Sequence, residues 1–118
     1  MSATDPAFLA FLEQQRAEFR ASLPEWLADI ESLWRQALSD GAPAAALATL
    51  ERRAHSLAGS GATFGFAGLG DAARALELAL NPLVDAAHAL TPAAQADVSR
   101  ALEALQRSLP GEIRIRGA

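Results

Sequence analysis

The chain has no cysteine, and aromatic side chains make up only 6% of its residues. The absence of cysteine excludes disulfides and thiolate metal sites. Few aromatics beside many alanines and leucines favour helices over sheets. No apolar run approaches the roughly 18 residues that span a bilayer, and the first residues lack the basic and apolar regions of a secretory signal. We therefore expect a cytoplasmic protein without a membrane partner.

Net charge is also low, at -4 from 14 acidic and 10 basic residues. Such a chain has no broad electrostatic attraction for phosphate backbones, so we expect no nucleic-acid partner. Its 118 residues are typical of one domain. A hydrophobic fraction of 51% with 20% charged residues is typical of a compact fold rather than a disordered chain.

Proline, glycine and capping residues divide the chain into five expected helices. Asp5 and Ser22 are candidate caps for the first two, and Thr91 followed by proline is a strong start signal for the last. Asn81 and Pro82 weaken or end the fourth helix. The expected helices cover residues 5–21, 22–39, 43–61, 66–80 and 91–109.

Apolar residues at helical spacing give each expected helix a core face. The faces are Phe8, Leu12, Gln15 and Phe19; Leu27, Ile30, Trp34, Ala37 and Leu38; Leu47, Leu50, Ala54, Leu57 and Gly61; Leu69, Ala73, Leu76 and Leu80; and Val98, Leu102, Leu105 and Leu109. Short connections favour antiparallel neighbours. The sequence therefore predicts an all-α fold, an antiparallel up-down four-helix bundle with an additional N-terminal helix, followed by a flexible tail at residues 111–118.

His55 lies within the third expected helix but outside its core face. At about 100° per residue it projects roughly 130° from the centre of that face, toward solvent or the margin of a neighbouring helix. Ala48, Gly59 and Ala62 surround it, and Gly59 costs about 1 kcal/mol relative to alanine inside a helix. A lone surface histidine is usually just solvated, and glycines near a helix end are usually caps, so these residues alone leave its role open.

The stretch "AHSLAGSGATFGFAGLGDAARALE", residues 54–77, resembles the signature of histidine phosphotransfer (HPt) domains, the phosphocarriers of bacterial multistep phosphorelays. Its "GATFGF" portion is similar to the phosphotransfer domain of chemotaxis kinases. The expected helix order agrees with that family's bundle. The resemblance implies that residues 1–110 form one HPt domain, that His55 is phosphorylated, and that Glu77 orients it by accepting the proton on Nδ1.

The resemblance also implies the partners. Nε2 of His55 would attack the acyl phosphate of an aspartate in a response-regulator receiver domain, or accept phosphate from a hybrid histidine kinase. Mg²⁺ is expected in the receiver, with no cofactor or metal bound by this chain. Small residues would form the docking surface, namely Ala48, Ala58, Gly59 and Ala62. We expect a monomeric phosphocarrier, not an enzyme with ATP-dependent kinase activity.

One departure from the family pattern concerns charge. Most relatives carry a lysine three residues after the histidine, where this chain has Ala58. Arg52, Arg53 or Arg74 could replace the missing cation, and Arg74 is favoured because it should lie beside Glu77 on the facing helix. The alternative function is a transfer-impaired HPt-like module that sequesters a receiver domain.

Other residues receive structural interpretations. Phe64 and Phe66 are expected in the bundle core, with Gly65 permitting the turn between them. His88 has no comparable surroundings and is assigned no role. Metal binding is disfavoured because the two histidines are far apart, and hydrolysis is disfavoured because Ser60 lacks an evident base. No phosphate-binding glycine loop with lysine is present.

Overall fold

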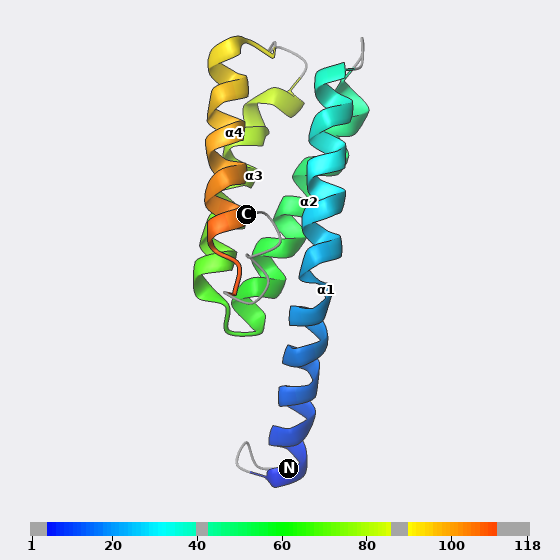
Figure 1. Cartoon of the computed structure of the whole chain (residues 1–118), viewed down its shortest axis with the longest axis vertical. Coiled ribbons are helices and arrows are strands. Elements are labelled where there is room, and N and C mark those ends of the chain that lie inside the picture. The colour runs from blue at the N-terminus through cyan, green and yellow to red at the C-terminus, as the bar shows by residue number, and fades with distance from the viewer. Residues whose placement is uncertain (1–4, 40–42, 86–89, 111–118) are drawn as a thin grey trace.

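The protein is described by a computed structural model that places residues 5–39, 43–85 and 90–110. These residues form helices and no strands, which confirms the all-α prediction. Among them, no helix has the length and apolar character needed to cross a bilayer. The expected tail at 111–118 and His88 lie outside the described residues. The helices are α1 (Pro6–Ser39), α2 (Ala44–Thr63), α3 (Ala67–Val84) and α4 (Pro92–Arg107) (Figure 1).

A single helix, α1, replaces the two helices predicted before residue 40. The Ser22 hydroxyl does not cap a second helix, because it donates to the Phe19 carbonyl at 2.6 Å within α1. Pro24 lies inside the helix, at a cost of about 3 kcal/mol. Leu23 and Ile30 are fully buried on either side of it, and each such side chain contributes about 1.5–3 kcal/mol. The prediction of a separate N-terminal helix is therefore wrong, because burial of a continuous stripe outweighs the proline.

The N-terminal part of α1 projects beyond the other helices (Figure 1). A helix of 34 residues is about 51 Å long, which accounts for the longest dimension of the molecule, 53 Å. Leu9, Phe11 and Leu12 are exposed on this projecting part. Of the first predicted core face only Phe19 is buried, so the prediction failed where no other described helix runs beside α1.

The predicted core faces of the third and fourth helices are confirmed. All five residues named for α2 and all four named for α3 are buried. Helix α3 continues through Pro82 to Val84, beyond the end expected near residue 80, and Leu83 in this added turn is also buried. Burial of Leu83 offers a reason for the helix to continue past a proline that removes one backbone hydrogen bond.

Two of the predicted helix caps are present, at the starts of α1 and α4. Asp5 Oδ1 accepts a hydrogen bond from the Ala7 backbone N–H at 2.8 Å. Thr91 Oγ1 accepts one from Ala94 at 3.1 Å at the start of α4.

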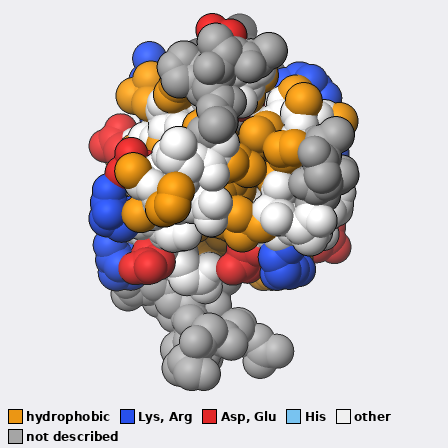
Figure 2. Space-filling view, turned by 90° about the horizontal axis from the view of Figure 1, so that it is seen from above, with side chains coloured by type: hydrophobic (Ala, Val, Ile, Leu, Met, Phe, Trp, Pro, Cys, Tyr) orange, Lys and Arg blue, Asp and Glu red, His pale blue; other side chains and the backbone are white. Residues whose placement is uncertain are grey.

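Seen along the long axis, hydrophobic side chains gather between the helices and charged side chains lie around the outside (Figure 2). Leu38, predicted to be buried, is instead exposed near the end of α1.

The turn between α2 and α3 is fixed by backbone and aromatic contacts. Phe66 N–H donates to the Gly61 carbonyl at 2.8 Å, and Gly65 N–H donates to Ala62 at 3.3 Å. Gly65 has a φ of 83°, in the region that glycine adopts without strain. These bonds form the Schellman pattern of helix termination. Phe64 and Phe66 pack against Phe19 of α1, with their ring centroids 5.1 and 5.7 Å from the centroid of the Phe19 ring. Both are only partly buried, so they lie at the edge of the core and not within it as predicted.

Helices α2 and α3 approach each other closely at two glycines. A Cβ atom added to Gly61 would lie 3.0 Å from the backbone nitrogen of Gly70, and one added to Gly70 would lie 3.2 Å from the Ala58 carbonyl oxygen. Both distances are tighter than most Cβ contacts in proteins, so a side chain at either position would force the facing backbone to shift by a few tenths of an ångström, and glycine avoids this shift. Away from this contact, position 55 of α2 faces position 77 of α3.

Candidate functional site

His55 stands on the solvent side of α2. Its side chain is 71% exposed, whereas the five core residues of this helix are buried. The ring is therefore reachable by a second protein. Nε2 makes no hydrogen bond within the part of the chain that the structure describes.

Glu77 reaches His55 from the facing helix. The distance from Glu77 Oε2 to His55 Nδ1 is 2.8 Å, and the glutamate side chain is only 17% exposed. A carboxylate can only accept a hydrogen bond, so it holds the proton of a neutral imidazole on Nδ1. That tautomer leaves the lone pair on Nε2, which is the nitrogen without a protein partner. The pair thus presents a nucleophilic nitrogen to solvent.

The other oxygen of Glu77 has no competing partner. Oε1 is buried, and no group among the described residues hydrogen-bonds to it. A buried polar atom without a partner is uncommon and calls for an explanation. Here it means that the carboxylate has one hydrogen bond in the described structure, the one to the histidine.

The small residues named for docking lie around the histidine as expected from the helical wheel. Ala48 and Ala58 are partly exposed, and Gly59 and Ala62 are exposed. A Cβ atom added to Gly59 would meet nothing within 4 Å. No large side chain of these four positions therefore stands beside His55, and the surface there leaves room for the backbone of another protein.

The three arginines considered as replacements for the missing lysine differ in their contacts. The chain contains no lysine at all, so any cation here must be an arginine. Arg53 Nε donates to Asp29 of α1 at 2.6 Å, and Arg52 donates to the Thr49 hydroxyl at 3.2 Å. Arg74 is exposed, one turn before Glu77, and makes no ion pair with another described residue. Among the described residues, Arg74 thus lacks the side-chain partners that hold Arg52 and Arg53.

Leu78 is a residue that the sequence analysis missed. It follows Glu77 on α3 and is 56% exposed, outside the buried stripe of that helix. Arg74 and Leu78 are one turn apart and so share one side of α3. The signal was present, since this leucine does not fit the spacing of the core residues, but the docking surface was predicted from small residues alone.

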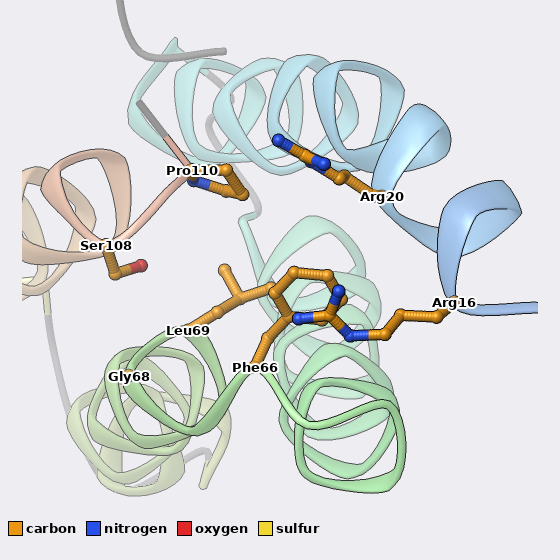
Figure 3. A pocket seen from close by; sticks show the side chains of 7 residues that line it. All are labelled: Arg16, Arg20, Phe66, Gly68, Leu69, Ser108 and Pro110. Atoms are coloured by element: carbon orange, nitrogen blue, oxygen red, sulfur yellow. The ribbon is translucent and has the colours of Figure 1, made fainter. Parts of the chain in front are cut away.

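His55 does not line the cavity drawn in Figure 3. This cavity of about 370 Å³ lies near the α2–α3 turn, and none of its lining residues belongs to the docking surface. Arg16 reaches across it, donating to the Phe64 carbonyl at 3.0 Å with its guanidinium 4.2 Å from the centroid of the Phe66 ring (Figure 3). The lining residues are Arg16, Arg20, Phe66, Gly68, Leu69, Ser108 and Pro110. His55 and Glu77 do not line this cavity, and the imidazole is instead exposed on the surface of α2.

Comparison with known proteins gives one match. A family model described as the Hpt domain matches residues 14–108, which is most of the chain. Comparison with curated proteins and with solved structures found no match. The matched segment starts within α1, so residues 6–13 of the projecting part precede it.

Proposed function

The chain belongs to the Hpt domain family, and on this premise we propose that it is a histidine-containing phosphocarrier of a bacterial two-component phosphorelay. Hpt domains transfer phosphoryl groups in phosphorelays, interact with receiver domains and histidine kinases, and are carriers rather than kinases. His55 accepts the group from a receiver aspartate or a hybrid histidine kinase and passes it to another receiver. The hydrogen bond between the exposed His55 and the largely buried Glu77 is the observation that supports this role.

The chemistry follows from the orientation of the ring. The lone pair of Nε2 attacks the phosphorus of an aspartyl phosphate, a nitrogen–phosphorus bond forms, and the bond from phosphorus to the aspartate oxygen breaks. The carboxylate leaves with the electron pair, and Mg²⁺ held by the receiver stabilises the transferring group. Glu77 keeps its hydrogen bond to Nδ1–H and offsets the positive charge that develops on the ring. The reverse sequence returns the group to an aspartate.

The partner docks over the surface formed by α2 and α3. Ala48, Ala58, Gly59 and Ala62 allow close approach, and Leu78 adds a larger apolar contact. Arg74 and Arg52 supply positive charge for the phosphoryl group. The interface is small and transient, because a relay component must release its partner.

The remaining parts of the proposal concern the whole protein. Residues 1–110 act as a single Hpt domain whose four helices form an antiparallel up-down bundle. The protein works in the cytoplasm as a monomer, and it binds no cofactor of its own.

The proposal is tested by phosphate transfer. The protein is incubated with a set of receivers that carry aspartyl phosphate, and acid-labile phosphate is located by mass spectrometry. We expect the wild-type protein to gain one phosphoryl group on His55 and the His55→Gln variant to gain none. Phosphate on another residue, or no phosphate from any receiver of the set, would contradict the proposal.

A second candidate function is a transfer-impaired module that sequesters a receiver. It is favoured by Ala58, which stands where most relatives carry a lysine. Calorimetric titration with the same receivers separates the two functions. Tight binding that is equal for wild type and His55→Gln, with no phosphate moving, supports sequestration, whereas rapid transfer through a weak complex supports the phosphocarrier.

A further inference from the structure

A second polar contact joins α2 and α3 one turn away from the histidine. Glu51 precedes His55 by one turn on α2, and Asn81 follows Glu77 by one turn on α3. The Asn81 side-chain amide lies against two acceptors, the Glu51 carboxylate and the backbone carbonyl of Glu77, the latter at 3.1 Å. Since both are acceptors, the amide is assigned with its nitrogen toward them. Asn81 therefore bridges the two helices next to the His55–Glu77 pair.

This bridge lies beside the proline of α3. Pro82 is inside the helix, and it has no N–H to donate to the carbonyl of Leu78. The last turn of α3, just beyond Glu77, thus lacks one backbone hydrogen bond. On the other side of Glu77, the helices are held by the contact of Gly61 with Gly70. The Asn81 bridge completes a pair of fixed points on either side of the glutamate.

The bridge also binds the carboxylate of Glu51, which could otherwise compete with Glu77 for the proton of His55. Glu51 and His55 are four residues apart on one helix, a spacing at which side chains meet. A Glu51 carboxylate without a partner is within reach of the imidazole and competes with Glu77 for its proton. The amide of Asn81 holds Glu51 on the α3 side of the site instead.

We propose that Asn81 is a positioning residue for phosphotransfer, acting by binding Glu51 and the Glu77 main chain so that Glu77 alone fixes the His55 tautomer. This inference rests on the proposed function for its effect on transfer. Its effect on the ring is independent of any partner. Asn81 is exposed and Glu51 partly exposed, so the bridge adds order to the site without forming part of the core.

The test uses the full-length Asn81→Ala variant and two measurements. Nitrogen NMR of the His55 ring, at a pH where the imidazole is neutral, reports which nitrogen carries the proton. In wild type we expect the Nδ1–H form to predominate, and in Asn81→Ala the Nε2–H share to rise. Single-turnover transfer from a saturating phosphorylated receiver should slow by roughly threefold to tenfold, at or below the lower end of effects seen when groups that orient a histidine are removed.

Two controls separate positioning from a general loss of structure. Gln95→Ala removes another side-chain amide that donates to a backbone carbonyl, that of Leu90 at 3.0 Å, at the start of α4. This variant should leave both the tautomer and the transfer rate unchanged. Glu51→Gln keeps an oxygen acceptor for Asn81, and Glu51→Ala removes the competing carboxylate while leaving the contact of Asn81 with the Glu77 carbonyl. Both variants should therefore keep the wild-type tautomer and transfer rate.

The outcome that overturns the proposal is specific. Asn81→Ala should add no further loss in a Glu77→Gln background, because the glutamate through which it acts is gone. An equal loss in both backgrounds, or wild-type tautomer populations in Asn81→Ala, would refute the positioning role. If wild type itself takes no phosphate while the tautomer shifts as expected, the proposed function fails and the role of Asn81 in orienting the ring stands.

Discussion

Gly59 and Gly61 lie two residues apart on α2, and their surroundings are opposite. Gly61 touches the backbone of α3 so closely that a Cβ atom would lie 3.0 Å from the Gly70 nitrogen, whereas a Cβ atom on Gly59 would meet nothing within 4 Å. Both glycines weaken the helix by about 1 kcal/mol relative to alanine. Packing within the chain explains the glycine at position 61. Nothing within the described residues explains the glycine at position 59. The comparison teaches that packing within the fold accounts for Gly61 and not for Gly59, which we propose for the partner interface.

The same division runs along the whole α2–α3 pair. The closed side holds the leucines and alanines of both core faces, and the open side holds His55, Glu77, Arg74 and Leu78. Residues on the closed side should affect stability, and residues on the open side should affect transfer. Matched substitutions on the two sides test this division.

The largest effect is expected for Gly61→Leu. Its side chain cannot fit against the α3 backbone, and overpacking of this kind costs typically about 1–3 kcal/mol. We expect a loss near the top of that range, measured as the free energy of unfolding in urea. Gly59→Leu is the matched control and should be at least as stable as wild type. Equal destabilisation by both variants would erase the distinction between the two glycines.

Gly59→Trp should affect transfer and not folding. A large ring beside His55 blocks close approach of a receiver, and we expect transfer to slow about 30-fold, equivalent to about 2 kcal/mol. Ala75→Trp is the control, because it places the same ring on an exposed position of α3 about 160° from Glu77 by helical geometry. A Gly59→Trp protein that transfers at the wild-type rate would remove Gly59 from the docking surface.

Leu78→Ala should weaken docking with little change in chemistry. Truncating an apolar contact residue at an interface commonly costs about 1 kcal/mol, so the receiver concentration for half-maximal rate should rise about fivefold. The rate at saturation should stay unchanged. Leu38→Ala, at another exposed leucine near the end of α1, should alter neither quantity. A change in the saturating rate alone would count against a docking role.

Arg74→Ala should have the smallest effect. Loss of one exposed positive charge near the incoming phosphoryl group should slow transfer about threefold at low salt. The difference in rate between the variant and wild type should shrink as ionic strength rises. Stability should be unaffected. Arg100→Ala removes an exposed arginine of α4 that pairs with Asp97 and serves as the charge control. An unchanged transfer rate in Arg74→Ala would show that Arg74 does not replace the lysine that most relatives carry.

Local patterns in the chain were sufficient for much of the fold. The core faces of α2 and α3 followed from spacing, because burial on one side of a helix imposes its period on the apolar residues. The caps at Asp5 and Thr91 followed from the need of the first backbone N–H groups for an acceptor. The pairing of His55 with Glu77 was expected only through the family resemblance, since spacing within one helix says nothing about its neighbour.

Tertiary structure decided the rest. Local signals at Ser22 and Pro24 indicated a break in α1, yet burial of the continuous stripe through Leu23 outweighed it. The stripe through Leu12 had the right period, but no described helix lies beside it to bury it. The different roles of Gly59 and Gly61 depend on how close α3 comes. Sequence by itself determined which side of each helix is apolar, and only the packing of helices decided which of those sides is covered, because burial is a property of neighbours far apart in the chain.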